Sequence, residues 1–180
     1  MLIIGDLIVG NGRIWFETAP AEISRQIYHN NPFPESIPIA GYLKSHTTPD
    51  DKIAVLGSEP ELFFLSDRRS ASGYIYLYSL TDPQPLAPTM RAEFISQIET
   101  ARPKYIVFAN INTSWFLVIK PESMQLGADI LDWWGNYFTN YTLVGAVKIY
   151  EYQPAEFLWD EQLLGHPETT NDDVFVYLRK

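Results

Sequence analysis

The chain has 180 residues, of which 46% are hydrophobic, 14% aromatic and only 19% charged. This composition predicts a packed globular protein, and the length suits a single domain. The formal net charge of −9 argues against a nucleic-acid partner, because the average surface repels phosphate backbones. The absence of cysteine excludes disulfides, thiolate metal sites and thiol catalysis.

We divide the chain into a lead-in segment, residues 1–17, and one α/β domain, residues 18–180. The apolar start "MLIIGDLIVG" is interrupted by Gly5 and Asp6, and it is far shorter than the about 20 apolar residues that span a bilayer. It also lacks the basic start and the cleavage pattern of a secretory signal. We therefore expect neither a membrane span nor an export signal in this segment.

The expected elements follow from apolar spacing, capping residues and breakers. In chain order they are helices at 18–28 and 35–46, a strand at 52–57, a helix at 59–66 that opens on an S-x-x-E capping box, a strand at 73–80, a helix at 89–101, a strand at 104–111, a helix at 129–141 and strands at 142–152 and 174–180. This alternation predicts a three-layer α/β sandwich with a mostly parallel, Rossmann-like sheet. Residues 152–173 are expected to form an irregular excursion, followed by a last strand at the sheet edge, antiparallel to its neighbour.

Ligands of open α/β sheets bind beyond the carboxyl ends of the strands. Three expected loops lie there: "GSEPE", which carries Glu59, "YSLTDP" after the second strand, and "NINTSW", which carries Asn110, Asn112 and Trp115. The last loop suits a sugar or carboxylate pocket with an aromatic floor, although Asn, Ser and Thr after a strand are also common in turns. A nucleotide site is disfavoured, because "GSEPE" lacks the G-x-G-x-x-G pattern and carries two carboxylates.

The stretch "SDRRSAS" contains the adjacent pair Arg68 and Arg69, followed by Ser70 and Ser72. Two guanidinium groups and two hydroxyls within five residues could bind a phosphate. Alternatively, the arginines cap the preceding helix and pair with carboxylates such as Asp67. Because they follow a helix and precede a strand, we place them at the edge opposite the ligand edge, which favours the structural role.

No catalytic constellation is recognisable. The chain has no G-x-S-x-G elbow, no P-loop and no H-E-x-x-H, and its histidines, His29, His46 and His166, are far apart. We therefore expect no catalytic residue, no metal and no cofactor. Of the adjacent Trp133 and Trp134, one is expected in the core, because neighbouring helical residues point about 100° apart.

Four stretches, "NPFPE", "VLGSEPE", "RRSASGYIY" and "ARPKYIVF", carry a resemblance that extends over residues 18–152. They resemble the soluble region after the last transmembrane helix in bacterial membrane glycosyltransferases of the dolichyl-phosphate-mannose protein mannosyltransferase type, within the GT-C superfamily. The resemblance implies a multi-pass parent enzyme that transfers a sugar from a polyprenyl-phosphate donor on the extracytoplasmic, periplasmic face. In that family the catalytic acids lie in loops between the early transmembrane helices, so no position here corresponds to them, and Met1 would not be the natural start.

The resemblance therefore implies a non-catalytic accessory domain that assists donor or acceptor binding or stabilises the enzyme. Its partners would be the transmembrane region of the same polypeptide and a polyprenyl-phosphate sugar or a glycan acceptor. The α/β pattern alone leaves an alternative, a stand-alone binding module for a sugar or a phosphate. A soluble hydrolase or transferase is disfavoured, because no nucleophile and base can be recognised.

Overall fold

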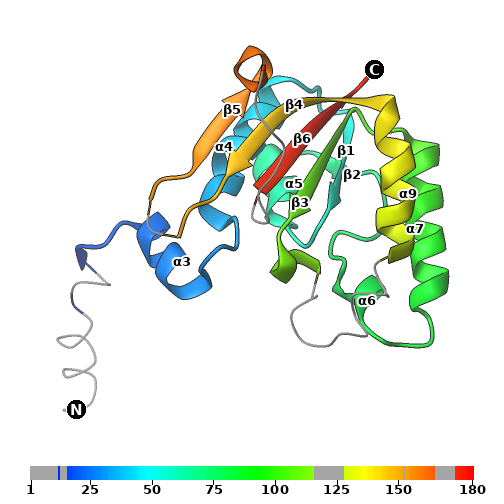
Figure 1. The fold of residues 1–180 in the computed structure, drawn as a ribbon, viewed down its shortest axis with the longest axis horizontal. Helices are drawn as coiled ribbons and strands as arrows, with labels where there is room; N and C mark the ends of the chain where they lie inside the picture. The colour runs from blue at the N-terminus through cyan, green and yellow to red at the C-terminus, as the bar shows by residue number, and fades with distance from the viewer. Residues whose placement is uncertain (1–11, 13–15, 116–127, 152, 165–172) are drawn as a thin grey trace.

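The computed structural model describes residues 12, 16–115, 128–151, 153–164 and 173–180. The strands are β1 (Lys52–Leu56), β2 (Arg69–Ser70), β3 (Tyr105–Asn110), β4 (Tyr141–Lys148), β5 (Glu156–Trp159) and β6 (Asp173–Arg179). They form one open mixed sheet of six strands in the order β2-β1-β3-β6-β4-β5 (Figure 1). β1 is parallel to β2 and β3, whereas β6 is antiparallel to β3 and β4, and β4 is antiparallel to β5.

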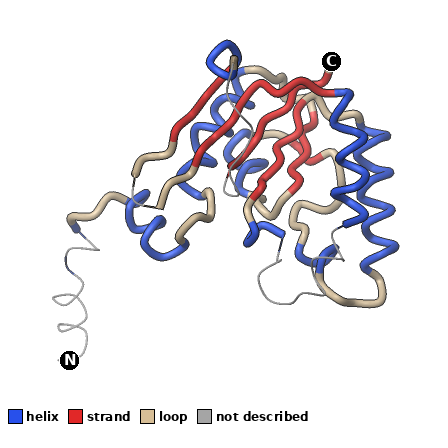
Figure 2. The backbone as a smooth tube through the Cα atoms, viewed as in Figure 1, coloured by secondary structure: helices blue, strands red, loops and turns tan. Residues whose placement is uncertain are grey.

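Helices lie on both faces of this sheet (Figure 2). The α-helices are α3 (Pro20–Tyr28), α4 (Phe33–Ser45), α5 (Glu61–Ser66), α6 (Tyr78–Thr81), α7 (Ala87–Ala101) and α9 (Ala128–Tyr137), and the 3-10 helices are η1 (Asn112–Trp115), η2 (Phe138–Asn140) and η3 (Asp160–Leu163). α4 and α5 pack on one face, and α7 and α9 on the other. The α/β class expected from the sequence is confirmed.

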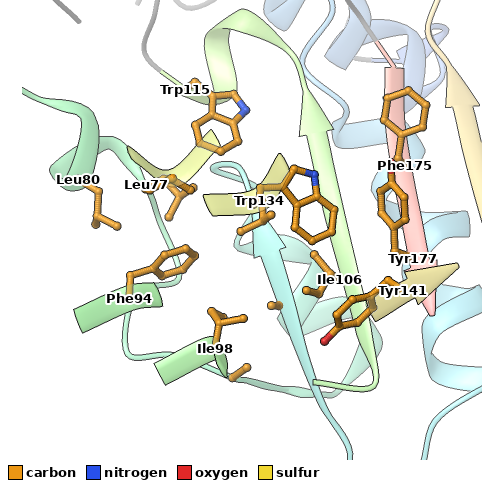
Figure 3. Close-up of a cluster of buried hydrophobic side chains, with 14 of the residues drawn as sticks. Leu77, Leu80, Phe94, Ile98, Ile106, Trp115, Trp134, Tyr141, Phe175 and Tyr177 are labelled. Atoms are coloured by element: carbon orange, nitrogen blue, oxygen red, sulfur yellow. The ribbon is translucent and has the colours of Figure 1, made fainter. Parts of the chain in front are cut away.

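The two faces carry separate hydrophobic cores, because consecutive strand residues point to opposite sides. In β1, Ile53 and Val55 join the core under α4 and α5, whereas Ala54 and Leu56 join the core under α7 and α9. The second core is rich in aromatic rings, and Trp134 lies at its centre beside Tyr141 and Tyr177 (Figure 3). Trp133 is only partly buried, so one of the two adjacent tryptophans is a core residue, as the helical spacing predicts.

The expectation of a mostly parallel sheet is wrong, because only two of the five strand pairings are parallel. β6 is the cause. β3 and β4 run in the same direction, as a strand–helix–strand crossover requires, but β6 lies between them in the opposite direction. The last strand is therefore antiparallel to its neighbours, as expected, but central, and its nearly continuous burial fits that position.

Two further expectations about individual elements are wrong. The strand expected at 73–80 is not formed: residues 73–77 are a loop, residues 78–80 belong to α6, and the strand beside β1 is the two-residue β2 further upstream. Leu77 and Leu80, three residues apart, are buried while Ile75 and Tyr76 are exposed, which is a helical spacing. The excursion at 152–173 also contains regular structure, β5 and η3, in its described part. β5 pairs with β4 where Gly145 leaves room for the Trp159 ring.

The connections around β1 create the place where a ligand can bind. After β1 the chain passes through α5 to β2 on one side, whereas β3 lies on the other side of β1. The loops that follow β1 and β3 therefore diverge and leave a crevice at the carboxyl ends of the two strands, the usual ligand position in open α/β sheets. In Figure 1 this edge faces down, toward α6 and η1.

Candidate functional site: the crevice beyond β1 and β3

Glu59 and Ser114 meet across this crevice. Glu59 belongs to the loop after β1, and Ser114 belongs to η1, after β3. Only 3% of Glu59 and 2% of Ser114 are exposed. The Ser114 hydroxyl donates a hydrogen bond to Oε1 of Glu59, while Oε2 is buried without a hydrogen-bond partner in the described part of the chain. A carboxyl group is thus held in the interior by the Ser114 hydroxyl, with the backbone amides of Ser58 and Glu59 also acting on it.

Gly57 makes room for this carboxyl group. A Cβ atom at position 57 would collide with the carboxylate of Glu59 and with the side chain of Ala109 in β3. The glycine therefore allows the Glu59 side chain to fold back over the end of β1. The capping box expected at 58–61 is not formed: Ser58 accepts a hydrogen bond from the Leu77 amide, and α5 begins after Pro60 without a side-chain cap.

Burial raises the pKa of Glu59 to about 8. The Ser114 hydrogen bond opposes this shift, because it stabilises the ionised form, and the nearby charge of Glu61 adds to it. Most of the Glu59 carboxyl groups are therefore protonated at pH 7. A protonated carboxyl group can both donate and accept hydrogen bonds, and a strongly shifted acid in a crevice is a marker of functional sites.

A cavity of about 310 Å³ lies over Glu59. Its polar lining comes from four segments of the chain: Tyr28, Asn31, Ser58, Glu59, Glu61, Tyr76, Tyr78 and Ser114. Burial raises the pKa of Tyr78 to about 12, so its hydroxyl stays neutral and donates to the carbonyl oxygen of Thr113 at 2.5 Å. The described lining includes no lysine or arginine. The crevice is therefore lined by hydroxyl and amide groups, the neutral carboxyl group of Glu59 and the carboxylate of Glu61.

The predicted residues of the loop after β3 are separated by the structure. Asn110 is the half-buried last residue of β3, and Asn112 is exposed and lines a neighbouring cavity. Trp115 is 3% exposed, and its indole nitrogen donates to the carbonyl oxygen of Ala109 at 2.6 Å (Figure 3). The tryptophan is part of the hydrophobic core and does not form the floor of the cavity.

The arginine pair lies at the opposite edge of the sheet, since Arg69 is paired with Lys52 at the start of β1. Arg69 is exposed, but only 7% of Arg68 is exposed. The guanidinium group of Arg68 donates to the carbonyl oxygens of Lys44, Thr47, Ser66 and Asp67 and to the Thr47 hydroxyl. It thereby caps the carboxyl ends of α4 and α5, as the structural interpretation expects.

The two serines of the same stretch are engaged in a local turn. Ser70 accepts a hydrogen bond from the Ser72 amide, and the Ser72 hydroxyl donates to the carbonyl oxygen of Tyr74. Of the residues singled out in the sequence, the crevice therefore holds Glu59 and not the arginine–serine stretch. Asn31, Tyr76 and Tyr78 were not singled out in the sequence. The two tyrosines were assigned to a strand, although the loop "YSLTDP", which begins at Tyr78, was placed at the ligand edge.

A larger cavity of about 740 Å³ lies between α3, α4 and the segment leading into β5. Its lining is rich in proline, with Pro34, Pro38 and Pro154, and its buried carboxylate, Glu35, is paired with Arg25. A buried acid that already has a cationic partner is a structural ion pair more readily than a ligand group. The crevice over Glu59 is therefore the stronger candidate site.

No protein-family model, no curated protein and no solved structure matches this chain. None of the helices in the described ranges has the length and apolarity needed to cross a bilayer. Within the same ranges, no group of three or more His, Asp or Glu side chains is arranged to hold a metal ion. The geometry of the crevice is therefore the feature of the molecule that bears on its function.

The substitution Glu59→Gln should change how stability depends on pH. Because the folded pKa is raised, the folded state holds a proton that the unfolded chain releases, so wild-type stability falls as pH rises from about 4.5 to about 8. Glutamine cannot ionise. Relative to wild type, the free energy of unfolding of the variant should rise by up to roughly 1.4 kcal/mol for each pH unit in this window. Outside the window, the difference between the two proteins should not change with pH. Urea unfolding from pH 4 to pH 9 measures this difference.

The control is Glu151→Gln, which removes a carboxyl group from an exposed position. A difference between Glu59→Gln and wild type that does not change with pH would contradict the assignment of a neutral, buried acid.

Arg68→Met should lower the free energy of unfolding by about 2–4 kcal/mol, because four carbonyl oxygens lose a charged donor and methionine only fills the space. The matched control, Arg69→Met, should cost less than about 0.5 kcal/mol, since this side chain is exposed. Chemical unfolding of both variants provides the measurement. Equal effects would show that burial of Arg68 is not what holds the ends of α4 and α5.

Proposed function

We propose that this domain is a non-catalytic accessory domain of a multi-pass membrane glycosyltransferase and that it binds an uncharged sugar in the crevice beyond β1 and β3. The resemblance of its sequence to the region after the last transmembrane helix of such enzymes supports the first part. The chemistry of the crevice supports the second. The domain would then act on the periplasmic face, next to the transmembrane region of its own polypeptide, and would help to hold the glycan acceptor or the sugar unit of the donor.

The observation that carries the proposal is the neutral acid at the base of a cavity lined by hydroxyl and amide groups. Sugars present many hydroxyls, each of which both donates and accepts hydrogen bonds. Glu59 in its protonated form offers the same dual capacity. The hydroxyls of Ser114 and Tyr78 already donate to Glu59 and to the Thr113 carbonyl, so toward a ligand they serve as acceptors. Ligand sites usually combine such polar groups with an apolar wall, which Phe33 and Pro60 supply here.

The same lining disfavours a phosphate. Phosphate sites use arginine, lysine or bare helix amides, and the described lining has neither cation, while Glu61 contributes a carboxylate. Arg68 was a phosphate-binding candidate in the sequence. Its guanidinium group donates to backbone carbonyl oxygens at the edge of the sheet opposite the crevice. The proposal therefore puts a sugar unit in the crevice and leaves the polyprenyl phosphate to the membrane-embedded part of the enzyme.

A stand-alone sugar-binding module is the second candidate, and the complete core on each face of the sheet favours it. A domain whose two faces are both covered does not need a further layer to bury apolar surface. The two candidates share the crevice and its ligand class, and they differ in the polypeptide to which the crevice belongs.

Sugar binding is tested by thermal shift and calorimetry with D-mannose, D-glucose, D-galactose and N-acetylglucosamine, against inorganic phosphate and mannose 1-phosphate. At least one neutral sugar should raise the Tm, with a stabilisation of about 2.7 kcal/mol at 100 times its Kd. Ser114→Ala should weaken binding at least about tenfold, because it removes the partner that holds Glu59.

Ser45→Ala, at an exposed serine of α4, is the control for this measurement and should leave affinity unchanged. Binding of the phosphates alone, or equal affinity of wild type and Ser114→Ala, would overturn the sugar site.

The parent enzyme is tested by an immunoblot of fractionated source cells with antiserum raised against this chain, whose own mass is 20.7 kDa. If the chain is part of a membrane glycosyltransferase, the antiserum should detect a band much larger than 20.7 kDa in the membrane pellet. A band near 20.7 kDa in the soluble fraction would contradict this proposal and would support the stand-alone module.

A further inference from the structure

A second cavity, of about 420 Å³, adjoins the crevice. It lies between the end of α3 and the loop after β3, and it shares Tyr28 and Asn31 with the cavity over Glu59. Two cavities that share lining residues on the same side of the sheet can receive one extended ligand. The volume of a single cavity is near the lower limit for small-molecule sites, which usually measure about 300–1,000 Å³.

A chain of hydrogen bonds marks the boundary between the two cavities. The Thr113 hydroxyl donates to Oδ1 of Asn31 at 2.6 Å, and the Tyr78 hydroxyl donates to the Thr113 carbonyl at 2.5 Å. These contacts join the α3–α4 connection, η1 and α6. They hold the two cavities in a fixed relation, so that the spacing of their polar groups is set before a ligand arrives.

The second cavity, like the first, presents amides and hydroxyls. Its lining contains the amides of Asn30, Asn31 and Asn112, the hydroxyl of Thr113 and the ring of His29, and the described lining has no Asp, Glu, Lys or Arg. Oδ1 of Asn30 is buried and accepts no hydrogen bond in the described part of the chain. Ile27 and Ile111 add apolar wall. Amides and a hydroxyl on an apolar wall again match a polyhydroxylated, uncharged ligand.

Tyr28 joins the two cavities into one surface. Its ring lines both, is 51% exposed, and packs edge-on against Phe33 with the ring centroids 5.0 Å apart. An aromatic ring fixed in this way offers an apolar face and a hydroxyl to a ligand that crosses from one cavity to the other.

We propose that the crevice and the second cavity are two subsites for one oligosaccharide, with one sugar unit over Glu59 and the next beside Asn112. This inference rests on the proposed sugar binding and adds the length of the ligand to it. It assigns Asn112, Asn30 and Thr113 to the second subsite and Tyr28 to the junction. The ligand class is a neutral glycan of at least two units, such as a glycan acceptor.

The experiment compares D-mannose and D-glucose with α-1,2-mannobiose, maltose and cellobiose by calorimetry and by amide chemical shifts of the nitrogen-15-labelled chain. At least one disaccharide should bind at least about tenfold more tightly than the monosaccharide it contains. Its shift changes should include residues of both cavities, whereas those of the monosaccharide should centre on the Glu59 crevice.

The variant Asn112→Trp fills the second cavity from an exposed position. It should reduce disaccharide affinity to that of the monosaccharide and leave monosaccharide affinity unchanged. Asn136→Trp, an equal change at an exposed position of α9, is the control and should have no effect.

The outcomes separate this inference from the proposed function on which it rests. If monosaccharides bind and no disaccharide binds more tightly, or Asn112→Trp leaves disaccharide affinity unchanged, the second subsite is wrong and the sugar site stands. If none of these sugars binds, both are wrong.

Discussion

The candidate site depends on the burial of one carboxyl group at the point where the loops that follow β1 and β3 diverge. Glu59 reaches this position because Gly57 has no side chain, and Ser114 holds it from the other strand's loop. Burial keeps the acid mostly protonated at neutral pH. A buried acid with one unpaired oxygen costs stability, and its position at the carboxyl ends of β1 and β3 is what makes the crevice a candidate site.

The sequence predicted most of the helices and strands but not the order of the strands in the sheet. Apolar runs such as Ile53–Leu56 and Tyr105–Phe108 identify buried strands whichever neighbour they have. The same local pattern does not predict that β6 lies between β3 and β4, because the pairings of β6 with these strands join residues far apart in the chain. The mixed sheet is therefore a tertiary property that local spacing does not encode.

The candidate site was predictable in part. The rule that ligands bind beyond the carboxyl ends of strands led to the loops of Glu59 and Ser114. It also led to the loop that begins at Tyr78, but it singled out neither Tyr76 nor Tyr78. Alternating tyrosines favour a strand on local grounds, whereas Leu77 and Leu80 are drawn into the core as one turn of helix. Asn31 comes from a fourth segment, and only the packing of α3 and α4 beside η1 brings it to the crevice.

The placement of cations supports the proposal of a neutral ligand over an anion. The buried arginines, Arg68 and Arg91, direct their guanidinium groups at backbone carbonyls, and Arg91 also pairs with Asp129. Cations so engaged complete helix ends and loops within the fold. The ligand edge is left with hydroxyls, amides and carboxyl groups in a chain of net charge −9. An anionic ligand would meet repulsion there without a compensating donor, whereas a sugar can use each of these groups without moving a charge out of water.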